Sequence, residues 1–161
     1  MRFQNVIEIE ASISDVFEFV SDMRNMPKWN YFVTEVTQEN GEGPERGARY
    51  HQRRKTDSQR YEMIHLEPGR SVIIKTIPGA SPKFERHLRF EAVPNGTRLI
   101  DEMSLPTGYP GIVEGLFAGR VRRAVAENLG KLKELLEHGH TQLQDGRGVY
   151  RAAVGGAKAK Q

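Results

Sequence analysis

Apolar and polar residues follow two different periods along the chain, and the change falls near residue 110. Before it, short segments alternate between apolar and polar positions, which is typical of strands with one buried face. After it, apolar residues recur every three or four positions, which predicts a helix over 110–138. A helix of about 29 residues is about 43 Å long, longer than one small sheet needs, so we expect a cavity beneath part of it. Its apolar stripe consists of Val113, Leu116, Phe117, Val121, Ala124, Val125, Leu129, Leu132 and Leu136.

The alternating segments predict seven strands in an antiparallel sheet, because short turns connect most of them. Asn95-Gly96 accepts the positive φ angles of a tight hairpin turn and joins the last two strands. Two short helices are expected after the first strand, one capped by Ser14 and one by Asp22. The fold class is therefore α+β. The strands are expected over residues 3–10, 32–39, 48–55, 60–66, 71–77, 83–93 and 97–105.

The periodic pattern ends after His138. Five glycines interrupt a polar and alanine-rich segment there, so we expect one folded domain over 1–138 and a disordered tail over 139–161. The tail holds four of the 24 basic side chains and one of the 21 acidic ones, and the remaining 20 of each cancel. The net charge of +3 is thus a property of the tail, and it gives no support to nucleic-acid binding.

Common motifs of catalysis and cofactor binding are missing from the sequence. The chain has no cysteine, which excludes disulfides and thiolate metal sites and fits a reducing cytoplasm. It contains no Gly-x-Ser-x-Gly segment and no phosphate-binding loop, and no apolar run of about 18 residues that would cross a membrane. We therefore expect a cytoplasmic protein with neither a metal nor another cofactor.

Five segments resemble the polyketide cyclase/dehydrase and lipid-transport family of the START-like (SRPBCC) superfamily. They are IEASISDVFEFVSD at 9–22, PKW at 27–29, GARY at 47–50, NGTRL at 95–99 and NLGKLK at 128–133. The resemblance covers residues 3–138 and implies a helix-grip fold, in which a seven-stranded antiparallel sheet wraps around the long helix and encloses a pocket. It also implies a hydrophobic or amphipathic ligand such as a lipid, a polyketide or a quinone. Some members of the family catalyse cyclisation or dehydration.

Side chains on the strand faces that point toward the helix are expected to line this pocket. A shift of register by one position would exchange the two faces of a strand, and each apolar residue of the set also suits plain core packing. The ligand-binding residues predicted on this basis are Tyr50, Met63, Ile74, Leu88, Phe90, Met103, Phe117 and Val121.

Arg86 and Asp101 are polar residues in the otherwise apolar alternation of the last two strands. Counting from the Asn95-Gly96 turn places them in neighbouring positions, close enough for a cross-strand ion pair. The pair is either buried or holds an anionic ligand through the arginine, unless a bulge turns both side chains to solvent. Tyr61 and His65 complete the catalytic candidates, since an imidazole titrates near neutrality, although a strand histidine also suits an exposed position.

Three functions are compatible with these features. The first is a binding or carrier module for a hydrophobic or amphipathic small molecule, because no covalent catalyst is present. The alternative is a polyketide cyclase, aromatase or dehydratase that uses the same cavity, and a partner-binding regulator is the third. Transient contact with an anionic membrane surface follows from the resemblance, because lipid-transfer members must dock to unload. The oligomeric state stays open.

Overall fold

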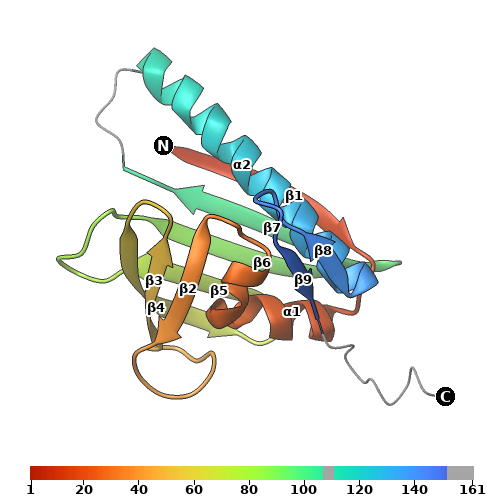
Figure 1. Ribbon diagram of the computed structural model, residues 1–161. Coiled ribbons are helices and arrows are strands. Elements are labelled where there is room, and N and C mark those ends of the chain that lie inside the picture. Colours follow the sequence, from red (N-terminus) through yellow and green to blue (C-terminus); the bar gives the residue numbers. More distant parts are fainter. Residues whose placement is uncertain (107–110, 152–161) are drawn as a thin grey trace.

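A curled antiparallel sheet of seven strands wraps around one side of a long helix (Figure 1). The structure is a computed structural model that describes residues 1–106 and 111–151. The spatial order β1-β7-β6-β5-β4-β3-β2 follows the chain except where β1 pairs with β7, and it confirms the predicted fold class. The strands are β1 (Arg2–Ile9), β2 (Val33–Gln38), β3 (Arg49–Arg54), β4 (Ser58–Glu67), β5 (Ser71–Thr76), β6 (Glu85–Val93) and β7 (Gly96–Ser104).

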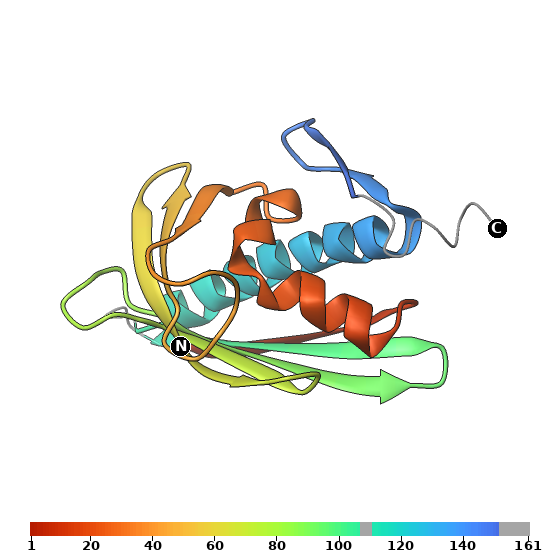
Figure 2. The same cartoon turned by 90° about the horizontal axis from the view of Figure 1, so that it is seen from below.

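Two short helices follow β1, and they lie with the long helix on the concave side of the sheet (Figure 2). Ser12 caps the first of them by accepting a hydrogen bond from the Asp15 amide, so the cap lies two residues before the predicted Ser14. Asp22 caps the second helix as predicted. In the described part of the chain, no helix is long and apolar enough to cross a membrane. The helices are α1 (Ile13–Ser21), the 3-10 helix η1 (Met23–Lys28) and α2 (Gly111–His138).

The turn between β6 and β7 depends on a glycine and fixes the register of these strands. Gly96 has a φ of +154°, and a Cβ at this position would overlap the carbonyl oxygen of Ile9 at the end of β1. Glycine therefore lets the hairpin close against β1. The resulting register pairs Leu88 with Asp101 and Arg86 with Met103.

The apolar stripe of α2 is buried only along the second half of the helix. The buried half contributes Leu129, Leu132, Leu135 and Leu136 to the hydrophobic core. Near the start of the helix, by contrast, Val113, Leu116 and Phe117 are 47%, 74% and 43% exposed. The first half of α2 therefore stands over the sheet without filling its concave face.

Residues 139–151 form a hairpin beside the end of α2 rather than the predicted disordered tail (Figure 1). In it, β8 (His140–Gln142) pairs with β9 (Gly148–Tyr150). Leu143 is buried, Thr141 donates a 2.6 Å hydrogen bond to a glutamate of α2, and Gly146 adopts a φ of +91° beside the turn. The expectation of disorder is therefore wrong for 139–151, because an apolar anchor and specific hydrogen bonds hold this polar segment. Residues 152–161 lie outside the described part.

Candidate functional site

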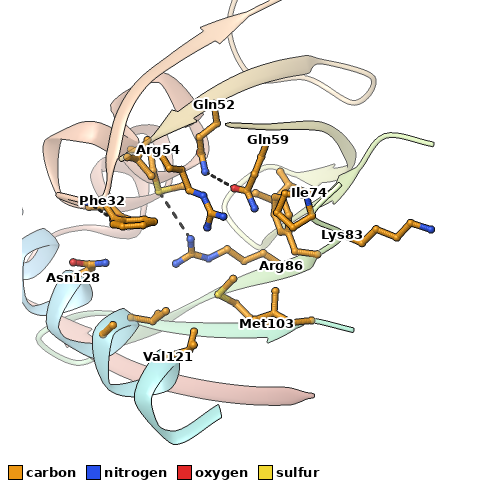
Figure 3. Close-up of a pocket in the computed structure, with 18 of the residues that line it drawn as sticks. Phe32, Gln52, Arg54, Gln59, Ile74, Lys83, Arg86, Met103, Val121 and Asn128 are labelled. Atoms are coloured by element: carbon orange, nitrogen blue, oxygen red, sulfur yellow. Dashed lines mark hydrogen bonds between the residues drawn. The ribbon is translucent and has the colours of Figure 1, made fainter. Parts of the chain in front are cut away.

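A pocket of about 590 Å³ lies between the first half of α2 and the concave face of the sheet (Figure 3). Strands β3 to β7 contribute side chains to it, and the connection between η1 and β2 closes one side. A cavity of this size suits a small organic ligand. Most of its wall is apolar, and the larger apolar side chains are Met26, Phe32, Ile74, Phe84, Met103, Leu105, Phe117 and Val121.

Half of the predicted ligand-binding residues line this pocket, namely Ile74, Met103, Phe117 and Val121. The other four lie in the core: Tyr50, Met63, Leu88 and Phe90. Phe90 packs edge to face against Phe17 of α1, with 5.0 Å between the ring centres. Alternation identifies the inward face of a strand, but α1 covers the other end of the concave face. Residues of β6 beneath α1, such as Phe90, therefore pack in the core without reaching the pocket.

The predicted ion pair between Arg86 and Asp101 is present and buried. Arg86 Nε donates to Asp101 Oδ1 at 2.9 Å, and Nη2 donates to Oδ2 at 2.6 Å. The two residues are 6% and 0% exposed, so the alternative in which a bulge turns them to solvent is wrong. Burial lowers the pKa of Arg86, but the charge and hydrogen bonds of Asp101 more than offset this effect and raise it overall. The guanidinium therefore stays charged inside the protein.

Arg86 lines the pocket, whereas Asp101 lies behind it. The remaining nitrogen of the guanidinium, Nη1, has only the sulfur of Met26 as a partner, at 4.0 Å (Figure 3). The guanidinium carbon also stands 5.5 Å from the ring centre of Trp29. Because sulfur is a weak acceptor, Arg86 keeps a strong donor that no protein oxygen uses.

A chain of three side chains runs from the core to the pocket wall. The Tyr61 hydroxyl donates to Gln52 Oε1 at 3.0 Å, and Gln52 Nε2 donates to Gln59 Oε1 at 2.9 Å. The two glutamines line the pocket, and the phenol lies one layer behind them. Complete burial raises the pKa of Tyr61 well above its usual value, so its hydroxyl stays protonated. The candidate Tyr61 therefore acts on the pocket only through Gln52.

Tyr50 stacks on Tyr61 with 5.4 Å between the ring centres. Its hydroxyl is the one buried side-chain polar atom of the described residues that has no hydrogen-bond partner. Burial, together with the charge of Asp22, raises the pKa of Tyr50 to about 12. The two stacked phenols differ in this way, since one is satisfied by Gln52 and the other is not.

His65 points away from the pocket, so its placement among the cavity residues is wrong. The pairing of β4 with β5 shifts between Met63 and His65, and this bulge reverses the alternation that the sequence suggests. The exposed imidazole lies 2.9 Å from the hydroxyl of Ser71. A general base at this position would not face a ligand in the pocket.

Several polar residues of the pocket were not among the predicted sites: Arg54, Gln59, Arg120 and Asn128. Arg54 uses Nε and Nη2 for two 2.6 Å hydrogen bonds to Asp57, and its guanidinium carbon is 5.5 Å from the ring centre of Phe32. It shares a strand face with Gln52, so alternation alone would have found it. Asn128 lies seven residues after Val121, on the same side of α2, and this spacing would have found it too.

Metal binding has no support in the part of the chain that the structure describes. Across residues 1–106 and 111–151, no group of three or more histidine, aspartate or glutamate side chains could hold a metal ion.

A curled antiparallel sheet, a long helix laid along it and a pocket between them define a START-like fold. The model of the family "polyketide cyclase / dehydrase and lipid transport" matches residues 1–137. The chain therefore belongs to this family. A search of curated protein sequences found no match.

Solved structures share the fold at low sequence identity. A START superfamily protein from Mycobacterium smegmatis is 17% identical with a TM-score of 0.66, over 84% of this chain and 98% of that chain. The Aha1 dimer from Colwellia psychrerythraea is 18% identical with a TM-score of 0.65, over 86% of this chain and 98% of that chain. A protein from Deinococcus radiodurans is 14% identical with a TM-score of 0.65, over 86% and 99%. These similarities establish the fold.

Proposed function

We propose that the protein binds and carries a hydrophobic or amphipathic small molecule in the pocket between α2 and the sheet. The observation that carries this proposal is the pocket itself, about 590 Å³ with a mostly apolar wall and a few buried polar groups. Such a wall holds an apolar body, while a small number of polar groups fix its orientation. The family description, which includes lipid transport, agrees with this function.

An enzymatic cyclase or dehydratase is the alternative that the family description also names. The positions of the acid and base candidates favour the carrier. His65 lies on the outer face, Asp101 is bonded to Arg86 behind the wall, and Tyr61 is separated from the pocket by Gln52. Among the four candidates, Arg86 alone lines the pocket, and a guanidinium that stays charged orients a ligand better than it exchanges protons.

The first half of α2 supports a route for ligand exchange. Its apolar residues Leu116 and Phe117 are exposed, and Phe117 belongs to the pocket wall. Pro82 and Pro106, in the segments before β6 and after β7, line the same region. A ligand that entered between these segments and α2 would meet apolar surface first and the polar groups of β3, β4 and β6 deeper inside.

Native mass spectrometry of the protein purified from its own cells tests the proposal, followed by denaturing extraction of the bound molecule. The test variant is Ala124→Trp, because Ala124 lines the pocket and an indole there would occupy it. The matched control is Ala126→Trp, an exposed position on the same helix outside the pocket wall. We expect a stoichiometric small molecule in the wild type and the control, and its loss in Ala124→Trp. Equal retention in both variants would contradict a ligand in this pocket.

A further inference from the structure

The pocket wall carries cationic side chains but, among its described residues, no carboxylate. The four basic residues are Arg54, Lys83, Arg86 and Arg120. The two arginines on strands are each paired with an aspartate, whereas Arg120 on α2 has no ion-pair or hydrogen-bond partner within the described residues. The amine of Lys83 points away from the other labelled side chains (Figure 3). The charge facing a ligand is therefore positive.

Both paired arginines leave the same nitrogen unused. In Arg86 and in Arg54, Nε and Nη2 donate hydrogen bonds to the two oxygens of one carboxylate. The Nη1 group of Arg86 meets only the Met26 sulfur, and the Nη1 group of Arg54 has no partner among the described residues. Two charged NH₂ groups thus remain on the pocket wall, held in place because the Nε and Nη2 atoms of each guanidinium are already bonded to a carboxylate.

The hydrogen bonds that link Tyr61, Gln52 and Gln59 determine which atom of the Gln59 side-chain amide faces the ligand, the oxygen or the nitrogen. A fully buried phenol must donate its proton, and Gln52 accepts it through Oε1. Gln52 consequently presents its NH₂ group to Gln59 and occupies the amide oxygen there. The free end of Gln59 is its NH₂ group. Asn128 resembles Gln59 in this respect, because its oxygen accepts a 3.0 Å hydrogen bond from Gln144 and its NH₂ group remains available to a ligand.

Donors therefore outnumber acceptors among the polar groups available to a ligand. The side-chain oxygens of Gln52, Gln59 and Asn128 are all occupied within the protein. An anion would accept hydrogen bonds from these donors, whereas the hydroxyl of a neutral alcohol would have no unoccupied amide oxygen to receive its proton. An ammonium group would find no carboxylate on the described pocket wall and would lie beside positive charge.

We propose that the ligand is an amphipathic anion, an apolar chain or ring system with one carboxylate. The carboxylate accepts hydrogen bonds from Arg54, Arg86 and Gln59, and the apolar body packs against Ile74, Phe84 and Met103. This inference rests on the proposed function, because it specifies the class of molecule that the same pocket takes.

Three probes with the same alkyl chain and different head groups test the inference at pH 7.5: dodecanoate and dodecylammonium, each below its micelle concentration, and dodecanol below its solubility limit. Isothermal titration calorimetry gives the three dissociation constants. We expect dodecanoate to bind at least tenfold more tightly than dodecanol, and dodecylammonium to bind most weakly. Equal affinity for dodecanoate and dodecanol would overturn the anionic preference and leave the carrier proposal standing. Failure of all three to bind would overturn both.

A pair of arginine variants tests the head-group contacts. Arg54→Gln removes a wall guanidinium, while Arg53→Gln alters the adjacent exposed residue, which pairs with Glu35 on the opposite face of β3. We expect Arg54→Gln to weaken dodecanoate binding about tenfold and to leave dodecanol binding unchanged, with no effect of Arg53→Gln on either. The same loss in both variants, or an equal loss for both probes, would overturn the assignment. Arg54 is partly exposed, so the variant is expected to fold.

Discussion

Replacing Asp101 with asparagine leaves a buried guanidinium without its counter-charge. The wild-type contact consists of two charge-assisted hydrogen bonds of 2.9 and 2.6 Å between residues that are almost inaccessible to solvent. Asparagine keeps the size of the side chain, but it offers one oxygen and turns an NH₂ group toward another donor. Breaking a buried ion pair by removing one partner costs about 3–5 kcal/mol of unfolding free energy. We expect Asp101→Asn to lose an amount in this range.

Urea unfolding at 25 °C, followed by the fluorescence of Trp29, measures the loss. At an m value of about 2 kcal/mol per M, the midpoint should fall by about 1.5–2.5 M. The matched control is Glu62→Gln, which makes the same chemical change in a cross-strand pair with Arg49 whose side chains are 30% and 55% exposed. Exposed pairs contribute about 0–1 kcal/mol, so the control midpoint should move by less than about 0.5 M.

A double replacement separates the cost of an unpaired charge from the value of the pair. In Arg86→Met with Asp101→Leu, both charges are replaced by apolar groups, and such replacements are often neutral or stabilising. We expect the double variant to be more stable than Asp101→Asn. A midpoint for Asp101→Asn as close to wild type as that of Glu62→Gln would refute the reasoning, because it would mean that Arg86 finds water or another acceptor.

Three further predictions concern the stacked phenols and the hairpin after α2. Tyr50→Phe should leave the unfolding free energy unchanged or raise it by about 1 kcal/mol, because the Tyr50 hydroxyl has no hydrogen-bond partner among the described residues. Tyr61→Phe should lower the unfolding free energy by about 1–3 kcal/mol, because Gln52 loses a hydrogen-bond partner. Urea unfolding compares the two variants. The unfolding free energy of the wild type should fall as pH rises from 10 through about 12, because Tyr50 loses its proton at a lower pH in the unfolded chain than in the folded protein. Over the same pH range, the urea midpoint of Tyr50→Phe should fall less than that of the wild type. Leu143→Ala should cost about 2–3 kcal/mol and Leu116→Ala, at an exposed site, under about 0.5 kcal/mol; equal thermal shifts would contradict the docking of the hairpin.

The ion pair between Arg86 and Asp101 was predictable because one turn determines its register. Asn95-Gly96 closes the β6–β7 hairpin, and neither strand contains a bulge between the turn and the pair. Every residue counted outward from the turn therefore keeps its face. The same counting fails in β4, where the pattern Tyr61, Met63, His65 continues in the sequence but the backbone bulges after Met63. Nothing in the local residue types marks that bulge.

The extent of the pocket was less predictable than the faces of the strands. Leu88 and Met103 both point toward the concave side, yet only Met103 lines the pocket. The difference depends on where α1 packs across the sheet, which is a property of tertiary packing and not of alternation. The hairpin after α2 was missed for a related reason, since buried Leu143 and partly buried Val149 anchor it among polar neighbours. Two apolar residues six positions apart give no periodic signal.

The two halves of α2 contribute to different parts of the protein, the second half to the core and the first half to the pocket. The second half buries its leucines against β1 and the core, so the helix is held firmly at one end. The first half contributes Val121, Ala124 and Phe117 to the pocket and leaves apolar surface exposed, so this end adds little to the core. A helix that is fixed at one end can line a pocket at the other end, and changes in the pocket-lining residues do not require repacking of the core. Arg86 stands at the boundary, because its Nε edge is bonded into the protein and its Nη1 group reaches the pocket wall.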